Sequence, residues 1–170
     1  STGLTLIDPD AGKAVFAFDC GSSLYFGAQA SKPQKGSFYI AAPDGYTYDG
    51  VIRVNRAQSG LCVANLLPVE TYVEGVLPYE ISSSWNLETQ KAFAVAVRSY
   101  TLANLDKHEK TYGFDLCNTT DCQVYRGVQS VNTKVKEAVA KTKNQVLSYR
   151  DVPFAAYYSS STGGCTASAY

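Results

Sequence analysis

The sequence predicts an α+β fold, in which an antiparallel strand-rich N-terminal part packs with two to three helices and a C-terminal β-hairpin. Two observations favour it. Turn-forming residues separate short β-forming runs over the first sixty-odd positions, whereas apolar residues recur at helical spacing after position 68. A length of 170 residues is that of one domain, so we expect residues 1–170 to form a single domain.

The N-terminal part is predicted to consist of hairpins. The predicted strands are residues 4–7, 14–18, 37–41, 46–54 and 61–66. Turn-forming residues precede or separate these strands, notably Pro43-Asp44-Gly45 and Gln58-Ser59-Gly60. Residues 28–36 are polar and typical of a loop.

Three helices are predicted after Pro68, which suits the first position of a helix. The first buries Val69, Tyr72, Val73 and Val76 on one face and is expected to end at Gly75 and Pro78. The second extends from residue 87 to about residue 105, with Asn86 as its N-cap, and its apolar middle indicates a buried helix.

The third helix is expected to begin at Asn132 or Thr133, with Val135, Ala138 and Val139 facing the core. The closing hairpin is predicted from residues 145–149 and 153–158, around a turn at residues 150–151.

Charge and composition exclude several classes of function. Fifteen basic and fifteen acidic residues give a net charge of zero, and no basic run is present, which disfavours nucleic-acid binding. No apolar stretch approaches the roughly 18 residues of a membrane span. Because the chain has neither a methionine nor a signal peptide, we expect an export signal or anchor to have been removed.

The aromatic residues are unusual, with 13 Tyr beside one Trp and one His. Tyrosine-rich surfaces suit sugar or peptide ligands, although strands also favour tyrosine. The single histidine, His108, lies in a charged segment that we expect to be solvated. Since no nucleophile elbow surrounds a serine, a serine hydrolase is disfavoured. A P-loop and a dinucleotide fingerprint are both absent.

Three features could carry chemistry. Glu80 lies between apolar neighbours after a helix break, and such a setting favours the protonated carboxyl that a general acid needs. Arg98 interrupts an apolar helix, so we expect a carboxylate or several carbonyls to meet it, with Glu70, Glu74, Glu80 and Glu88 as candidates. The small residues 159–164 are typical of a substrate-binding loop or of a flexible linker.

The odd cysteine count leaves at least one thiol without a partner in the chain. The five cysteines are Cys20, Cys62, Cys117, Cys122 and Cys165. Cys117 and Cys122 could bridge, or supply two of the four ligands of a zinc site, with Asp121 or His108 among the others. Half a site is a weak signal, so a structural pair is the favoured interpretation.

Residues from about 51 to 164 resemble the stage II sporulation protein D family. The resemblance rests on the run from Asn65 to Glu80, on Trp85, Leu87 and Glu88, on residues 91–100 and 117–125, on the hairpin region 145–158 and on residues 160–164. Residues 1–50 carry no assigned motif.

The resemblance implies a lytic transglycosylase that cleaves the bond between N-acetylmuramic acid and N-acetylglucosamine in denuded peptidoglycan strands and leaves 1,6-anhydro ends. The acid/base glutamate of the family falls on Glu80. Arg98, Tyr158, Ser160 and Thr162 are candidates to bind the substrate. Peptidoglycan strands, and a cell-wall amidase, are the partners that the family implies. The implied location is extracytoplasmic, in the cell wall, a periplasm-like space or the forespore intermembrane space.

Two departures from the family pattern bear on these expectations. Asp121 stands where members often have the metal-binding histidine before the second cysteine, so we expect no tightly held zinc and no other cofactor. The chain ends soon after Gly164, where members continue, so we expect a truncated C-terminus. Two other functions stay open: a non-catalytic, wall-binding amidase enhancer and a purely structural wall domain.

Overall fold

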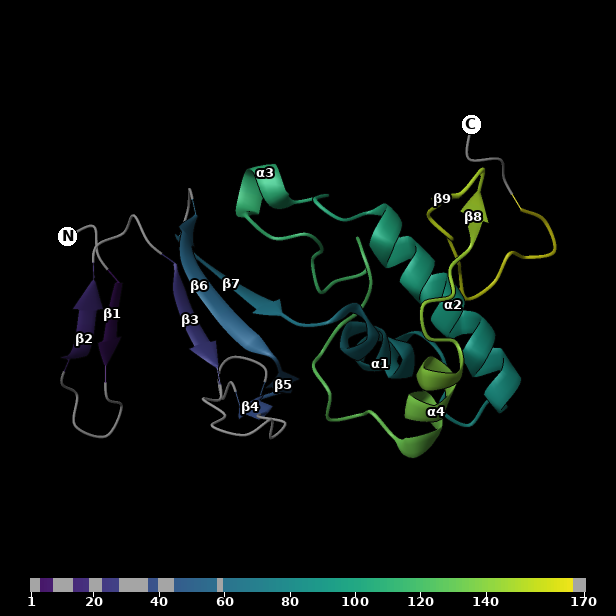
Figure 1. The fold of residues 1–170 in the computed structure, drawn as a ribbon, viewed down its shortest axis with the longest axis horizontal. Helices are drawn as coiled ribbons and strands as arrows, with labels where there is room; N and C mark the ends of the chain where they lie inside the picture. Colours follow the sequence, from purple (N-terminus) through teal and green to yellow (C-terminus); the bar gives the residue numbers. More distant parts are fainter. Residues whose placement is uncertain are drawn as a thin grey trace.

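The computed structural model describes residues 4–7, 14–18, 23–27, 37–39, 45–57 and 60–166 (Figure 1). Strands β1 to β7 come first, helices α1 to α4 follow, and the hairpin of β8 and β9 comes last. The mixed fold with antiparallel strands, helices and a C-terminal hairpin confirms the predicted fold class.

The central sheet is antiparallel and has the order β3-β6-β7. Its strands are β3 (Leu24–Gly27), β6 (Val51–Ala57) and β7 (Gly60–Leu66). Two separate antiparallel pairs are β1 (Leu4–Ile7) with β2 (Ala14–Phe18), and β4 (Ser37–Tyr39) with β5 (Thr47–Asp49).

The predicted strand 46–54 is in fact two strands, because Gly50 between them has a φ of +92° and turns the chain. Strand β3, a run of only four residues, was not predicted from its sequence. The predicted strand positions 40 and 41 and the predicted loop at residues 28–36 lie outside the described residues.

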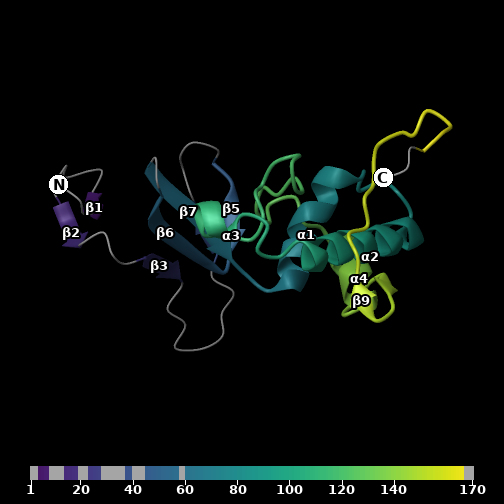
Figure 2. The same cartoon turned by 90° about the horizontal axis from the view of Figure 1, so that it is seen from above.

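Helices α1 (Val69–Glu80), α2 (Leu87–Ala103) and α4 (Thr133–Lys141) pack against one another (Figures 1 and 2). Helix α3 (Glu109–Tyr112) is a single turn that was not predicted. The predicted N-caps are confirmed: Asn86 Oδ1 accepts a hydrogen bond from Thr89 N (2.8 Å) and Asn132 Oδ1 accepts one from Val135 N (3.0 Å).

The predicted end of α1 was wrong, because the helix continues through Pro78 to Glu80. Gly75 lies inside α1 for a packing reason. A Cβ at this position would lie 2.5 Å from the Tyr125 ring, so only glycine lets the chain at residues 125–127 pass this closely.

The core lies between the sheet and the three long helices. It joins Tyr48 and Ile52 from the strands to the buried faces of the helices, and the partly buried Phe26 and Val54 pack against it. No described helix has the length and apolar character that crossing a membrane requires.

The C-terminal hairpin is shorter than predicted, with β8 at Ser148–Tyr149 and β9 at Val152–Pro153. Arg150 and Asp151 form its turn at φ values of 51° and 64°, as a two-residue hairpin turn requires. Beyond Pro153 the chain leaves the hairpin as irregular backbone and reaches the candidate site at residues 157–160.

Candidate functional site

A cleft of about 700 Å³ surrounds Glu80, and we call it the Glu80 cleft. It is lined by Pro78, Tyr79, Glu80, Ile81, Ser82, Trp85, Phe93, Tyr100, Thr120, Asp121, Cys122, Tyr157, Tyr158, Ser159 and Ser160. These residues come from the end of α1 and the loop after it, from α2, from the 120–122 segment and from the C-terminal segment. The cleft therefore forms only where distant parts of the chain meet.

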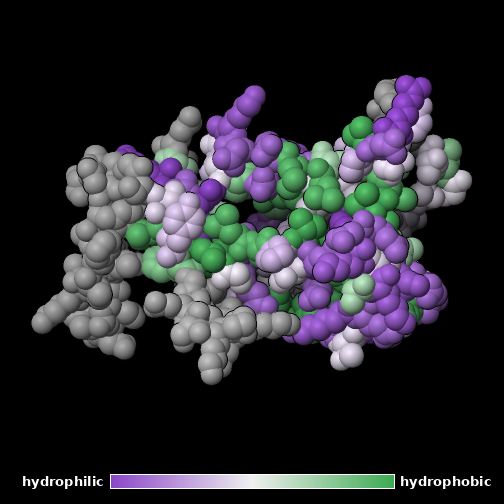
Figure 3. Space-filling model, viewed as in Figure 1, coloured by the Kyte–Doolittle hydropathy of each residue, from purple (hydrophilic) through white to green (hydrophobic). Residues whose placement is uncertain are grey.

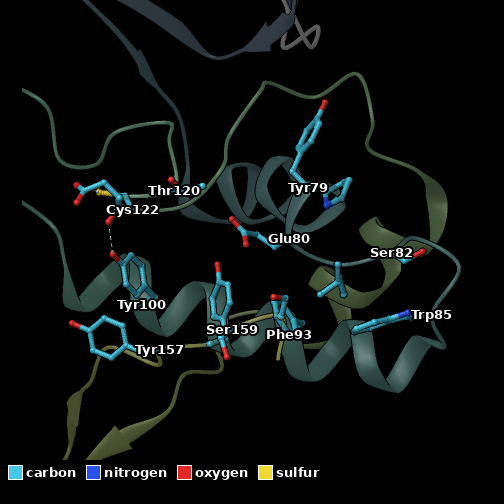
Figure 4. A pocket seen from close by; sticks show the side chains of 15 residues that line it. Tyr79, Glu80, Ser82, Trp85, Phe93, Tyr100, Thr120, Cys122, Tyr157 and Ser159 are labelled. Carbon is cyan, nitrogen blue, oxygen red and sulfur yellow. Dashed lines mark hydrogen bonds between the residues drawn. The ribbon is translucent and has the colours of Figure 1, made fainter. Parts of the chain in front are cut away.

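Glu80 is the last residue of α1 and is half-buried in the cleft. Its Oε1 accepts a hydrogen bond from the backbone N–H of Val124 (2.8 Å), which fixes the direction of the carboxylate. No other hydrogen bond reaches this carboxylate from the described residues. In Figure 4 it points into the cleft, with Tyr100 and Tyr157 to one side and Phe93 and Trp85 to the other.

Tyr158 lies in the same cleft, with its ring 4.8 Å from that of Phe93. Gln123 Nε2 donates to its hydroxyl at 3.2 Å. Burial raises the pKa of Tyr158 to about 12, the Gln123 hydrogen bond opposes this rise, and the Glu80 charge adds to it. The phenol therefore stays neutral at physiological pH and can donate its own hydrogen to a ligand.

Two exposed aromatic side chains also line the cleft. Trp85 is 49% exposed and Tyr157 is 77% exposed. The loop that carries Trp85 is held in place, because Gln90 Nε2 and Lys134 Nζ both donate to the carbonyls of Ser83 and Trp85. Aromatic faces with a polar rim suit the apolar face of a sugar ring.

Four potential metal ligands meet beside the cleft. The ligand atoms of His108, Cys117, Asp121 and Cys122 all lie within 4.8 Å of one another. His108 Nε2 is 3.3 Å from Cys122 Sγ and 3.3 Å from an Asp121 carboxylate oxygen. His108 is therefore not the solvated residue that the sequence indicated, since its side chain is only 19% exposed.

This set fits a zinc ion in its chemistry, because two thiolates, an imidazole and a carboxylate are all ligands that zinc takes. Cys117 and Cys122 lie close together, as both a structural pair and a shared metal site require. None of the four cysteines that the structure describes forms a disulfide. Lys107 Nζ lies 3.1 Å from Asp121 Oδ2, and this hydrogen bond holds the pKa of the Asp121 carboxyl below its ordinary value.

Residues 57–149 match the family model SpoIID, described as Stage II sporulation protein. The match covers more than half of the chain. The chain belongs to this family.

Curated relatives agree with the SpoIID assignment. The chain is 37% identical over 140 residues to an uncharacterised protein of Brachyspira hyodysenteriae. It is 43% identical over 94 residues to the amidase enhancer of Bacillus subtilis, and 30% identical over 117 residues to stage II sporulation protein D of the same organism. These alignments cover 79%, 55% and 61% of the chain, but only 38%, 12% and 34% of the relatives.

The structure brings together three of the five site residues that the sequence indicated for this SpoIID chain. Glu80, Tyr158 and Ser160 line the cleft, whereas Thr162 and Arg98 do not.

Arg98 is a correction to the expected set. Its side chain is 1% exposed and forms two hydrogen bonds to Glu70, Nε to Oε1 at 3.0 Å and Nη2 to Oε2 at 2.7 Å. Nη1 donates to the Gln145 carbonyl at 3.0 Å. The predicted acidic partner is thus confirmed as Glu70. A guanidinium bound in this way has no free face for a sugar, so Arg98 does not line the groove as expected.

Several cleft residues of this SpoIID chain were not predicted as site residues, notably Trp85, Phe93, Tyr100 and Tyr157. A sequence signal for two of them existed, because Phe93 and Tyr100 are seven residues apart on α2 and therefore share a face. Gln123, which is 1% exposed and bonds to Tyr158, carried no such signal.

Proposed function

We propose that this chain is a lytic transglycosylase, which cleaves the bond between N-acetylmuramic acid and N-acetylglucosamine in peptidoglycan strands without stem peptides. The observation that carries the proposal is the Glu80 carboxylate, fixed by the Val124 N–H in an open cleft with aromatic walls. Membership of the SpoIID family supports the proposal, since the resemblance to this family implies that its acid/base glutamate falls on Glu80.

In the proposed reaction Glu80 begins as the protonated acid. It donates its proton to the glycosidic oxygen while the bond to the anomeric carbon of the muramic acid breaks. The resulting carboxylate then takes the proton of the C6 hydroxyl of the same sugar, whose oxygen bonds to the anomeric carbon and closes a 1,6-anhydro ring. Glu80 returns to its protonated form, so one carboxyl group serves both steps.

The second carboxylate of the cleft, Asp121, does not replace Glu80 in this scheme. Hydrolytic glycosidases use two carboxyl groups in different protonation states. Lys107 lowers the pKa of Asp121, so Asp121 is ionised at neutral pH and is not a proton donor. The attack by the substrate's own hydroxyl requires no second carboxylate, so the proposed reaction needs Glu80 alone.

Tyr158, Ser160, Trp85 and Tyr157 are proposed to bind the glycan. The neutral Tyr158 hydroxyl and the Ser160 hydroxyl would hydrogen-bond to sugar oxygens, while the two exposed aromatic rings would stack on sugar faces. A metal ion held by His108, Cys117, Asp121 and Cys122 would link the 117–122 segment to the chain after α2 and stiffen one wall of the cleft. Because peptidoglycan lies outside the cytoplasm, this activity places the chain there.

A second candidate function is that of a wall-binding amidase enhancer without glycan cleavage. It is supported by the similarity to the Bacillus subtilis relative that bears this name. In this case a cell-wall amidase would be the partner, and the cleft would bind glycan without cutting it.

The test is digestion of denuded peptidoglycan, with mass spectrometry of the released products. We expect the parent chain to release saccharide products that carry no peptide and that end in 1,6-anhydro-N-acetylmuramic acid. Glu80→Gln keeps the hydrogen-bonding shape but cannot carry a proton, so we expect a loss of about a hundredfold to ten-thousandfold in rate with glycan binding retained. The control is Glu137→Gln, which removes a carboxylate from the exposed surface of α4.

Two outcomes would contradict the proposal. Equal rates for Glu80→Gln and the parent would make Glu80 structural. Binding of denuded glycan by both proteins without any cleavage would favour the amidase enhancer.

A further inference from the structure

A second groove, of about 610 Å³, separates the central sheet from the helices, and we call it the β7 groove. One wall is β7 with the chain that follows it, and the opposite wall is the 113–118 segment with the end of α2. The space-filling view in Figure 3 shows a hollow between these parts with hydrophobic side chains gathered around it. The 117–122 segment lies between this groove and the Glu80 cleft, since Cys117 lines the first and Cys122 the second.

Strand β7 is an edge strand beside this groove. It pairs with β6 on one side, and none of the strands that the structure describes pairs with its other side. In Figure 1, β7 lies on the side of the sheet nearer to the helices, and β6 separates it from β3. Alternate residues of an edge strand direct their N–H and C=O groups outward, which offers a template for another extended chain.

The groove is also apolar and open. Val63 and Leu66 of β7 and Leu105 after α2 line it, and they are 56%, 40% and 46% exposed. Phe114 and Leu116 add to the opposite wall. Large exposed apolar side chains that line one concave surface mark an interaction site more often than scattered ones do.

We propose that the β7 groove binds an extended, apolar peptide segment of a partner protein, which adds to the sheet as a strand beside β7. An extended peptide accounts for both observations, because its backbone can pair with the free edge and its alternate side chains can pack against the apolar walls. A glycan offers no regular row of N–H donors for the edge, and a lipid chain would leave the hydrogen-bonding groups of the edge unsatisfied.

The test is selection from a phage-displayed library of random linear peptides against the intact chain. Recovered peptides are then assayed by fluorescence anisotropy against two variants. Val63→Lys places a charge on the exposed edge within the groove, and we expect it to weaken binding about tenfold or more. Tyr25→Lys is the matched control, because Tyr25 is 61% exposed on β3 at the other edge of the sheet, and we expect it to bind like the parent.

Backbone pairing is tested separately with two N-methylated forms of the best peptide, one methylated at odd positions and one at even positions. Strand addition predicts that one form binds and the other does not, since only alternate amides face β7. The proposal is overturned if selection yields no peptide that binds the parent chain more tightly than Val63→Lys. It is also overturned if both methylated peptides bind as tightly as the unmethylated peptide. Glu80→Gln leaves peptide binding unchanged, so this result is independent of the glycan assay.

Discussion

One backbone N–H decides how Glu80 can act. The Val124 N–H holds Oε1, while Oε2 has no hydrogen bond from the described residues and is available to a substrate. Residues 117–125 contribute to the family resemblance, but the sequence did not predict that Val124 contacts Glu80. The contact exists because the 117–125 segment passes beside the end of α1, where Gly75 allows Tyr125 to approach the helix.

The cluster of His108, Cys117, Asp121 and Cys122 changes the expectation for zinc. From the sequence we expected no tightly held zinc, because Asp121 replaces a histidine and the two cysteines supply only half of the four ligands that a zinc site needs. The structure supplies four ligand atoms in one location. We therefore predict that the reduced chain takes up one zinc ion per molecule, measured by elemental analysis after removal of excess metal.

Variants of the cluster sharpen this prediction. Cys117→Ser and Asp121→Ala remove ligands and are expected to lower the zinc affinity by at least about tenfold in a competition assay with a chelator. Cys165→Ser is the matched control, because Cys165 is exposed and lies outside the cluster. A metal-free protein after reconstitution, or equal affinities for Cys117→Ser and Cys165→Ser, would contradict the prediction.

At the scale of elements, one partly buried ion pair connects α1 to α2. Glu70 lies in the first turn of α1 and Arg98 lies on the buried face of α2. The same guanidinium binds the Gln145 carbonyl, so it also holds the chain that leads to the C-terminal hairpin. The packing of α1 against α2 in turn sets the walls of the Glu80 cleft, because residues of both helices line it.

Arg98→Ala is therefore expected to destabilise the fold by about 3 kcal/mol, because it leaves the Glu70 carboxylate without its partner. Chemical denaturation measures the change in the free energy of unfolding. Lys91→Ala is the comparison, since it breaks the exposed Lys91–Glu88 ion pair at 2.9 Å and should cost about 1 kcal/mol or less. Similar decreases in the free energy of unfolding for the two variants would contradict the prediction, because the Arg98–Glu70 pair would then contribute no more than the exposed Lys91–Glu88 pair.

At the scale of the whole molecule, buried tyrosines join the sheet to the helices. Tyr72 of α1 packs on Tyr125 with ring centroids 5.1 Å apart, and Tyr125 packs on Tyr48 near the sheet at 6.0 Å. The Tyr125 hydroxyl donates to Asn65 of β7 at 2.7 Å. Burial raises the pKa of Tyr72, Tyr125 and Tyr158 above the ordinary value of about 10.

These shifts predict a loss of stability at alkaline pH. Above about pH 10 the unfolded chain releases phenolic protons that the folded chain retains, so the unfolded state binds fewer protons and the free energy of unfolding falls as pH rises. For Tyr158 the fall spans pH 10 to about pH 12. Denaturant midpoints at pH 8, 10 and 11.5, with absorbance at 295 nm to follow tyrosine ionisation, measure it.

Tyr158→Phe isolates the contribution of one phenol to this alkaline loss. Its stability should fall less steeply with pH than that of the parent, because phenylalanine does not ionise. Tyr157→Phe, which changes a neighbouring exposed tyrosine, should follow the parent. A stability that stays constant from pH 8 to pH 11.5 would contradict the prediction.

The sequence by itself determined several helix starts, the hairpin turn and the carboxyl group that lies in the cleft. Asn86 and Asn132 predicted their helix starts because an N-cap is a contact over three residues, and the turn at residues 150–151 followed from the same kind of local rule. Glu80 was indicated because its motif is a continuous run of residues. Helix ends were harder to predict, since tertiary packing carried α1 past Pro78.

Only the tertiary structure decided which side chains share a site. It paired Arg98 with Glu70 across two helices and so removed Arg98 from the groove, and it brought His108 from an apparently solvated segment to the two thiols. It also left one edge of β7 open beside an apolar groove. The physical reason is how far apart the interacting residues lie in the sequence. Helix caps and turns form between near neighbours in the chain, whereas ion pairs, metal sites and clefts depend on how distant segments pack.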